Sequence, residues 1–455
     1  MIKEKSFYKQ FFKLFLFLVF QNVIVLGVNL ADNVMVGSYS ETALSGVASV
    51  NQIQFVYLQI TMALGDTLVV IGSQYWGKKR TEEIKKLSAC SAVMAVCFGL
   101  ILFTAASLFP YQLVNLFTDS PDIIEEGVRY LHLIKYTYLV YALTNVMLAS
   151  MRSVESVKIA FLVSLSTLVI NCTINYLLIN GNFGFPRMGV TGAAIGTLTA
   201  RIVELVIVIL YLFLADKKLK LKPYNFIKLD GSFFKDYAKT SVNFIATAAL
   251  FGIATAMQTV ILGHMQDSAI AANSIANALY QLLKVAFVGA SSAAAVMIGI
   301  AIGKADMKKV KEYAKTLQII FLIIGVIMSI SLFFLRKPFL SIYNLSEQTY
   351  ALANGFILVL CFTGMGTAYE MPVLCGIVRG GGDSRFLVIN DFVSIWLIVL
   401  PVSYLAAFVF KWSPVAVVFC LNSDQIFKCA AAAIKCNSYT WIKKLTREPE
   451  VLLQK

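Results

Sequence analysis

Charged side chains are scarce in this sequence. Asp, Glu, Lys and Arg make up 14% of its 455 residues, and 58% of the residues are hydrophobic, whereas an ordinary soluble domain is roughly 25% charged and about 45 to 50% apolar. Only two histidines are present. The shortage of charge excludes an ordinary soluble domain and indicates a membrane protein.

The sequence also lacks the cysteine and histidine patterns of disulfide or zinc sites. None of its eight cysteines falls in a predicted outer loop, and no C-x-x-C occurs. Two pairs lie seven residues apart, about two helical turns, which indicates helix packing. These pairs are Cys90 with Cys97 and Cys429 with Cys436. His132 and His264 have no partner at ligand spacing, so we expect structural roles for both.

Long apolar runs are abundant. A helix that crosses a bilayer needs about 20 residues, and twelve such runs can be drawn. They lie at roughly 11–35, 46–74, 87–108, 124–149, 157–180, 190–215, 238–262, 268–302, 313–335, 350–378, 386–410 and 413–434. The first run ends in Asp32 and Asn33 without a small-residue cleavage site, so we interpret it as a retained helix and not a signal peptide. The sequence therefore predicts an all-α integral membrane protein with twelve transmembrane helices.

The orientation follows from the Lys and Arg residues of the loops. With the N-terminus inside, thirty of the 39 Lys and Arg residues fall in inner segments, and four fall in outer loops. We therefore expect a multi-pass protein of the cell membrane with both termini in the cytoplasm. A basic chain can bind nucleic acid, but these charges are spread over seven short segments. No nucleic-acid partner is expected, and we expect a monomer in the lipid bilayer.

The chain divides into two similar halves. We predict an N-lobe at 1–215, a cytoplasmic linker with an amphipathic stretch at 216–237, and a C-lobe at 238–455 with a short cytoplasmic tail. At an offset of 226, VGSYSETALSGVASVN (36–51) matches LGHMQDSAIAANSIAN (262–277), and GKKRTEEIKKL (77–87) matches GKADMKKVKEY (303–313). Two six-helix copies that both start inside are related by a pseudo-two-fold axis along the membrane normal. Such a plan is typical of transporters with a central substrate cavity.

Asp32 lies in the outer third of the first helix, and Asn171 and Asn175 lie one turn apart on the fifth helix at similar depth. Thr197 and the backbone of Ala193 lie at that depth on the sixth helix. A charged group at the bilayer centre costs from about 2.5 to more than 10 kcal/mol and usually marks an ion or proton pathway. Asp32 could take a proton or hold a hard cation. Alternatively, it caps the helix end or meets headgroup water, and the asparagines only bond helix to helix.

Other polar residues of the predicted helices suggest a substrate cavity. Helix position and repeat equivalence suggest that its walls include Asn51, Gln54, Tyr57, Asn277, Tyr280 and Gln281. Lys284 and Glu370 belong to the same predicted cavity. They could pair in the C-lobe because an unpaired buried charge is costly, or Lys284 could line a wet cavity and attract an anion.

Four further acids are predicted to be structural, near inner helix ends or against Arg201 and Lys428. They are Asp66, Glu204, Asp391 and Asp424. RGGGDS at 379–384 has the glycines of a phosphate cradle but lacks the preceding strand and the Lys-Ser/Thr of a P-loop. We therefore expect it to form the inner turn between helices ten and eleven.

The chain resembles the multidrug and toxic compound extrusion (MATE) family. The resemblance rests on ADNVMVG (31–37), on NCTINYLLINGNFGFPRMGVTGAAIGT (171–197) and on RGGGDS (379–384), together with the twelve spans and the duplicated half. It implies a V-shaped pair of six-helix lobes that exports substrates in exchange for Na⁺ or H⁺, without another cofactor. The family's first-helix aspartate falls on Asp32 and its fifth-helix asparagine on Asn171.

The resemblance also implies that the alanine carbonyl and threonine of the N-lobe cation site fall on Ala193 and Thr197. Two departures follow from the same comparison. Position 175 is Asn where some branches have Asp, and residues 240–266 lack the acid of the NorM-type branch. Lys284 is not a feature of the family. We therefore expect the ion site in the N-lobe.

The function expected from the sequence is secondary active efflux of small organic compounds, amphipathic or cationic as the resemblance implies, by alternating access and Na⁺ or H⁺ antiport. The alternative is a flippase of the related lipid-carrier exporter group, for which several Arg or Lys would be expected inside the cavity. An intramembrane transferase would need an acid or His constellation at the membrane surface, which the sequence lacks. We therefore do not expect an enzyme.

Overall fold

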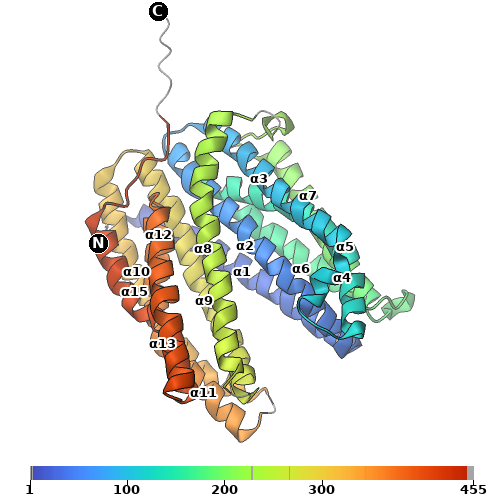
Figure 1. Cartoon of the computed structure of the whole chain (residues 1–455). Coiled ribbons are helices and arrows are strands. Elements are labelled where there is room, and N and C mark those ends of the chain that lie inside the picture. The colour runs from blue at the N-terminus through green and yellow to red at the C-terminus, as the bar shows by residue number, and fades with distance from the viewer. Residues whose placement is uncertain (1, 3, 227–228, 266, 344, 448–455) are drawn as a thin grey trace, which may run out of the picture. The chain divides into compact units, whose positions relative to one another are not determined.

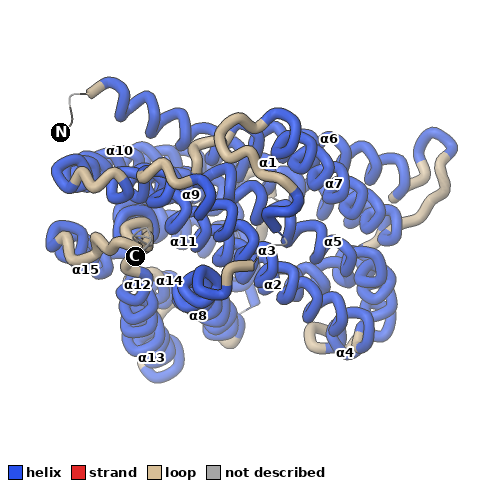
Figure 2. Tube along the Cα trace, turned by 90° about the horizontal axis from the view of Figure 1, so that it is seen from above, coloured by secondary structure: helices blue, strands red, loops and turns tan. Residues whose placement is uncertain are grey.

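The computed structural model describes the chain apart from residues 1, 3, 227–228, 266, 344 and 448–455. The described residues form helices joined by turns and short loops, and none of them lies in a strand (Figure 2). The all-α class predicted from the apolar runs is confirmed.

Twelve long helical segments follow one another among these residues (Figure 1). The first six are α1 (Lys5–Tyr39), α2 (Glu41–Gly77), α3 (Thr81–Leu108), α5 (Pro121–Ser153), α6 (Lys158–Leu178) and α7 (Val190–Leu210), which η2 (Tyr211–Ala215) extends. The next four are α8 (Gly231–Gly263), α9 (Asp267–Gly303), α10 (Met307–Leu340) and α11 (Glu347–Met371), which η4 (Pro372–Val378) extends. The eleventh is built from α12 (Ser384–Asp391), η5 (Phe392–Val399), α13 (Leu400–Tyr404) and η6 (Leu405–Val409). The twelfth joins α14 (Pro414–Leu421) to α15 (Asp424–Ser438), and the short elements are α4 (Pro110–Asn115), η1 (Asn182–Gly184) and η3 (Pro223–Phe226).

Eleven of these segments in the described chain are long and apolar enough to cross a membrane. The remaining one, α5, has 33 residues and carries Glu125, Arg129 and Lys135 within its length. Its position matches the run predicted at 124–149. The predicted set of twelve helices is therefore confirmed, with boundaries that extend beyond the apolar runs because the helices continue into the polar ends.

The chain forms two compact units. Unit 1 comprises Met1–Val19, Val70–Arg80 and Ala246–Lys455, and unit 2 comprises Phe20–Val69 and Thr81–Ile245. Three helices, α1, α2 and α8, therefore contribute one end to each unit. Each unit is described by itself below.

In unit 2, α2 packs closely against α5. A buried stripe on α2, which includes Val47, Val50 and Tyr57, packs into the core of the unit. Gly46 lies so close to α5 that an added Cβ would stand 2.7 Å from the backbone nitrogen of Gly127. The Tyr57 hydroxyl donates to the Tyr138 carbonyl oxygen at 2.5 Å. A membrane helix interface gains most of its stability from this kind of close packing.

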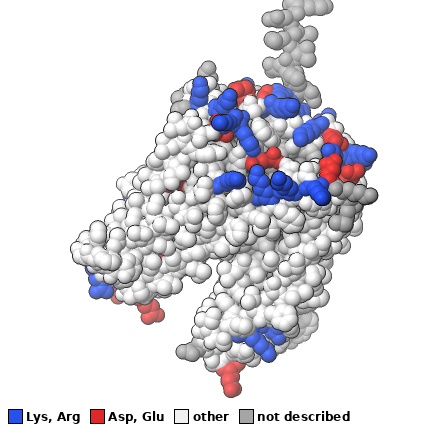
Figure 3. Space-filling model, turned by 180° about the vertical axis from the view of Figure 1, so that it is seen from behind, with Lys and Arg blue, Asp and Glu red and all other residues white. Residues whose placement is uncertain are grey.

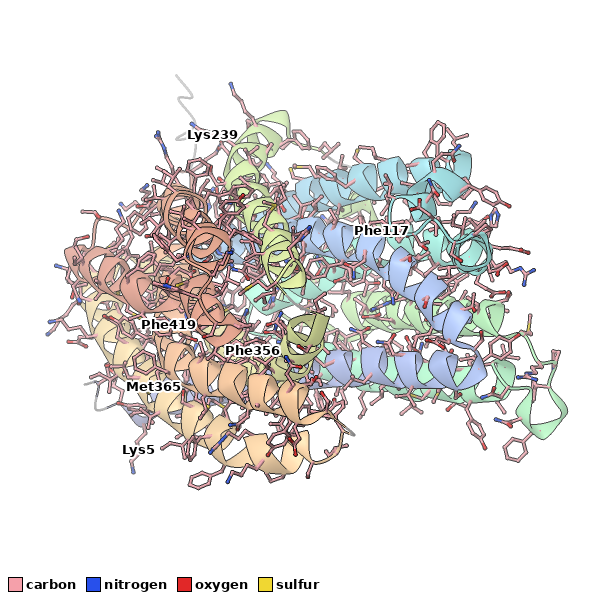
Figure 4. The ribbon with its side chains drawn as sticks, turned by 60° about the horizontal axis from the view of Figure 1, so that its bottom comes forward. Lys5, Phe117, Lys239, Phe356, Met365 and Phe419 are labelled. Carbon is pink, nitrogen blue, oxygen red and sulfur yellow. The ribbon has the colours of Figure 1, made fainter. Side chains whose placement is uncertain are left out.

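Unit 1 has a second core, centred on α9, α10, α11 and α14. Figure 4 labels Phe356 and Met365 on α11. Phe356 is fully buried in this core, whereas Met365 is 41% exposed. The ring of Phe419 on α14, also labelled, stacks on Phe362 with centroids 6.3 Å apart. Each helix therefore shows one face to the core and another to its surroundings.

Lys428 on α15 is buried and neutralises two partly buried acids of unit 1. Its ammonium lies 2.9 Å from Asp391 Oδ1 and 3.0 Å from Asp424 Oδ2, and the side chain of Lys428 is 5% exposed. The structure thus places these acids against Lys428, as the sequence predicts. The other two acids also have basic neighbours in unit 2. Arg201 lies 2.7 Å from Glu204, and Arg152 lies 3.3 Å from Asp66.

Lys and Arg side chains gather at one end of the helices. Figure 3 shows most of them, together with several acids, at the top of the view, whereas few lie along the sides of the visible face. This distribution agrees with loops that carry the positive charge.

Replacing Lys428 should destabilise the protein. In Lys428→Ala, the carboxylates of Asp391 and Asp424 lose their counter-ion within a membrane-embedded unit, and breaking such a pair costs about 3 to 5 kcal/mol. We expect a clearly lower melting temperature in detergent. Lys239→Ala is the control because Lys239 is an exposed lysine of α8, also labelled in Figure 4. Equal melting temperatures for the two variants would contradict the assigned role.

Candidate functional site

Three helices of unit 2 bring four of the predicted site residues together. Asn175 on α6 donates from Nδ2 to Asp32 Oδ1 on α1 at 2.5 Å. The same nitrogen lies 3.3 Å from Asn171 Oδ1, and Asn171 Nδ2 lies 3.3 Å from Thr197 Oγ1 on α7. Asp32 and Asn175 are 143 positions apart in sequence. The four side chains thus form one continuous series of hydrogen bonds. We call these four residues the Asp32 cluster.

The Asp32 cluster is shielded from solvent. Asn171 is 1% exposed and Asn175 is fully buried, whereas Asp32 is half-buried. Asn175 donates to the carboxylate, and Asn171 lies directly behind the Asn175 amide. Amide donors stabilise a carboxylate that has left bulk water, so the cluster can hold a charge that the surrounding helices could not.

The Asp32 carboxylate has no direct cationic partner in the described chain, where no Lys or Arg nitrogen is within 4.0 Å of it. Arg201 lies one turn beyond Thr197 on α7. Arg201 donates to Glu204 Oε2 at 2.7 Å, and its guanidinium lies 5.1 Å from the ring centroid of Tyr141. Arg201 is thus engaged by Glu204, and it acts on Asp32 only through longer-range attraction.

The carboxamide oxygen of Asn175 packs against α7. Its Oδ1 atom is buried and accepts no hydrogen bond, and it lies where a side chain at Gly196 of α7 would be. Gly192, one turn earlier, faces the Leu178 backbone of α6, where an added Cβ would stand 2.8 Å from the carbonyl carbon. The glycines of GVTGAAIGT therefore let α7 approach α6 closely enough to form the cluster.

The donor set suits a hard cation or a proton. Carboxylate, amide and hydroxyl oxygens are the ligands that such cations prefer, and the unsatisfied Asn175 oxygen is one acceptor without a partner. Ala193 is buried on α7 one turn before Thr197, but the structure records no side-chain contact to its carbonyl. A proton needs only the carboxylate itself.

Two of the predicted cavity residues lie elsewhere. Tyr57 and Tyr280 are 4% and 5% exposed and belong to the cores of their own units. The Tyr280 hydroxyl donates to Thr367 Oγ1 at 3.0 Å. The sequence suggested both for the wall of a cavity; in the structure each phenol finds a hydrogen-bond partner inside its helix bundle, on the apolar face of the helix.

The other four polar positions on these helices remain accessible. Asn51 and Gln54 on α2 and Asn277 on α9 are partly buried, and Gln281 is exposed. Asn277 donates to Asn273 Oδ1 at 3.1 Å, one turn earlier on α9. These four side chains therefore leave accessible polar surface on α2 and α9.

Lys284 and Glu370 are both half-buried in unit 1. In the described structure no hydrogen bond and no ion pair within 4.0 Å joins them, so the predicted direct pairing is not formed. The Lys284 ammonium lies 5.3 Å from the ring centroid of Phe251 on α8 instead. Attraction between Lys284 and Glu370 acts over a longer distance.

The two histidines lie apart from the Asp32 cluster in sequence, and both are exposed. His264 Nδ1 is 2.9 Å from the Val260 carbonyl oxygen of its own helix. In the part of the chain that the structure describes, no three side chains of His, Cys, Asp or Glu come together as a metal site would require.

Two residues of the site were missed in the sequence. Tyr130 of α5 is buried in the same core as Ala193 and Ala194 of α7. Gly196 sets the approach of α7 to Asn175. The repeated small residues of GVTGAAIGT signal close helix packing and could have indicated Gly196, but no pattern in α5 distinguishes Tyr130 from its neighbouring tyrosines.

The helices and the embedded carboxylate define a multi-span membrane transporter. The chain belongs to the MatE family, whose model matches residues 18–177 and 244–405. It is 25% identical over 443 residues to a probable multidrug resistance protein NorM of Thermotoga maritima, covering 97% of this chain and 95% of that one. It is 23% identical over 415 residues to the protein of the same name in Bacillus cereus, covering 89% and 90%.

Solved structures share the fold. A MOP superfamily transporter from Pyrococcus furiosus superimposes with a TM-score of 0.86 at 15% identity and covers 97% of both chains. The Vibrio cholerae MATE transporter VcmN in its bent form superimposes with a TM-score of 0.85 at 16% identity, covering 95% of this chain and 97% of that one. The fold implied by the resemblance is therefore confirmed.

Adding one methyl group at Gly196 should disturb the Asp32 cluster. The Cβ of Gly196→Ala would overlap Asn175 Oδ1, and overpacking of this kind costs about 1 to 3 kcal/mol. We expect a lower melting temperature than for Gly27→Ala, the control, because nothing lies within 4 Å of a Cβ at Gly27. An unchanged melting temperature in Gly196→Ala would show that the carboxamide is not held as described.

Proposed function

We propose that this chain is a secondary active exporter that exchanges small organic compounds for Na⁺ or H⁺, with Asp32 as the group that takes the ion. The names of its NorM relatives support drug export. The observation that carries the proposal is a carboxylate within a membrane span that accepts a hydrogen bond from the buried Asn175 amide and has no direct counter-ion. An intramembrane charge of this kind marks an ion pathway by default.

Ion uptake at Asp32 changes the bonding of three helices. A proton or Na⁺ removes the negative charge that Asn171 and Asn175 stabilise, so the links from α6 to α1 weaken. Residues 5–19 of α1 belong to unit 1 and residues 20–39 belong to unit 2. A rearrangement of α1 at Asp32 is therefore passed along a single helix from one unit to the other. This is how ion binding favours one of two conformations and lowers the affinity for substrate.

The substrate is a small organic compound, amphipathic or cationic, as for multidrug exporters. Partly exposed polar side chains on α2 and α9 provide its contacts, namely Asn51, Gln54, Asn277 and Gln281. The protein acts as a monomer in the cell membrane with both termini in the cytoplasm, and it needs no cofactor besides the coupling ion.

A flippase of a lipid-linked substrate is the second candidate. It is favoured by Lys284, whose ammonium has an aromatic ring and no ion pair as its direct neighbour in the described structure. Such a lysine could receive an anionic headgroup. Flipping of a fluorescent anionic lipid that is lost in Lys284→Ala, with no export of an organic cation, would favour this function over the first.

Removing the charge of Asp32 should abolish coupling. In Asp32→Asn the amide can neither take a proton nor hold a cation, so we expect gradient-driven transport of ethidium in inverted vesicles to fall at least tenfold. The Na⁺ and H⁺ gradients are imposed separately, which identifies the ion. Glu82→Gln, at an exposed acid of α3 whose side chain is 70% exposed, should transport normally. Wild-type transport by Asp32→Asn under both gradients would refute the proposal.

Placing a second acid in the cluster should increase its demand for a cation. In Asn175→Asp a carboxylate replaces the amide that donates to Asp32, and two adjacent carboxylates need a shared proton or cation. We expect the variant to melt at a lower temperature than wild type in choline chloride and to gain more stability from NaCl. The difference between the two salts isolates binding from screening. Equal Na⁺ effects on the variant and on wild type would contradict a cation at this place.

A further inference from the structure

The segment that follows α15, residues 439–447, is bound to other parts of unit 1. The Trp441 side chain is fully buried, and its Nε1 donates to the Cys436 carbonyl oxygen at 2.7 Å. The Lys443 amide donates to the Gly381 carbonyl oxygen at 2.9 Å. We call this segment the C-terminal strap.

The RGGGDS turn forms one half of the docking site for the strap. A side chain at Gly381 would overlap the six-membered ring of Trp441, so the glycine leaves the space that the indole fills. Gly382 has a φ of +106°, which favours glycine. The turn between η4 and α12 predicted for this motif is confirmed, and its glycines have a reason that the sequence did not show.

Asp383 adds charge to this half of the site. Its carboxylate lies 2.7 Å from Lys443 Nζ of the strap and 2.8 Å from Lys435 Nζ of α15. Burial alone would raise the pKa of Asp383, but the hydrogen bonds from Lys435 and Lys443 outweigh it and lower the pKa below its ordinary value. The ionised Asp383 thus binds the strap at neutral pH.

The other half of the site is the end of α2. The Gln74 carboxamide binds the strap backbone twice, because Oε1 accepts from the Leu445 amide at 2.9 Å and Nε2 donates to the Lys443 carbonyl oxygen at 3.1 Å. The Arg447 amide donates to the Tyr75 hydroxyl at 3.0 Å. Arg80 donates to the Arg447 carbonyl oxygen at 2.7 Å.

The same end of α2 packs directly on α9. Gly77 approaches α9 so closely that an added Cβ would stand 2.9 Å from Gly303 Cα. One turn earlier, a side chain at Gly299 would overlap Ser73. Gly77 and Gly303 are equivalent positions of the two sequence repeats, since they are 226 residues apart. This seam joins a helix of the first repeat to one of the second through small residues.

We infer that the C-terminal strap is a latch that holds the end of α2 against α9 and is released each time this end of the transporter opens. The inference rests on the proposed function in one respect, because alternating access requires the two repeats to separate at the Lys- and Arg-rich end, which we expect to face the cytoplasm. The strap bridges the two repeats through Gln74, Tyr75 and Arg80 on one side and the RGGGDS turn on the other. It therefore adds hydrogen bonds and an ion pair to the glycine contacts of the closed seam.

The latch is tested by the reactivity of a cysteine buried in the seam. Ser73 is fully buried, so Ser73→Cys should react with a membrane-impermeant maleimide only while the seam is open. Combining it with Leu445→Pro removes the amide hydrogen that Gln74 accepts, and combining it with Trp441→Ala empties the glycine pocket. Since a hydrogen bond contributes about 0.5 to 1.5 kcal/mol, we expect the labelling rate to rise about twofold to tenfold for Leu445→Pro and more for Trp441→Ala.

The control is Ser73→Cys with Lys444→Ala, because Lys444 is exposed between two anchored residues. Its labelling rate should equal that of Ser73→Cys alone, and each rate is counted above that of the parent with its eight native cysteines. Unchanged labelling in both Leu445→Pro and Trp441→Ala would overturn the latch. This readout does not depend on transport. If Asp32→Asn transports normally while the strap variants speed labelling, the proposed coupling fails and the latch stands.

A second measurement prevents release of the strap. Arg80→Cys with Arg447→Cys places thiols at two partly buried positions that are in contact through the Arg447 carbonyl. Joining them with a cleavable bifunctional maleimide should abolish ethidium export, and cleaving the linker should restore it, so each sample is its own control. Export that continues at the same rate in the fully cross-linked protein would contradict a strap that must release.

Discussion

The structure depends on how a single carboxylate is kept charged within an apolar helix bundle. Asp32 has lost part of its contact with water, and its compensation comes from the hydrogen bond of the Asn175 amide and from the longer-range attraction of Arg201, without a direct ion pair. Neutral donors stabilise the charge without cancelling it. The close approach of α7 to α6, made possible by Gly192 and Gly196, keeps the Asn175 amide in place.

Two partly buried acids of unit 1 have a permanent counter-ion instead. Asp391 and Asp424 share the ammonium of Lys428, which belongs to the protein itself and cannot leave. Glu204 of unit 2 is likewise paired with Arg201. A carboxylate with a permanent counter-ion gains little from an external cation, whereas one without a counter-ion gains much. This contrast distinguishes Asp32 from Asp391, Asp424 and Glu204 as a group suited to ion exchange.

Much of this architecture could be predicted from the sequence, because membrane helices are encoded by long apolar runs and their depth by counting residues from the ends. That reasoning placed Asp32, Asn171, Asn175 and Thr197 at one level, and the structure brings them together. It could not assign helix faces in the second and eighth spans, where apolar residues surround the helix on all sides. Tyr57 and Tyr280 were therefore expected in a cavity, although each is buried in its own unit. The strap was also invisible, since a bond from a glutamine side chain to a distant backbone leaves no periodic pattern.

The central claim is that the charge of Asp32 is cancelled by an ion during the transport cycle. Infrared difference spectroscopy of the purified protein observes this event without transport, because carboxylate and neutral carboxylic acid absorb at different frequencies. Acidification or Na⁺ addition should change the carboxyl bands of the wild-type protein, and the largest of these changes should be missing from Asp32→Asn. Difference spectra that are identical in the two proteins would show that the ion acts elsewhere and would contradict the account.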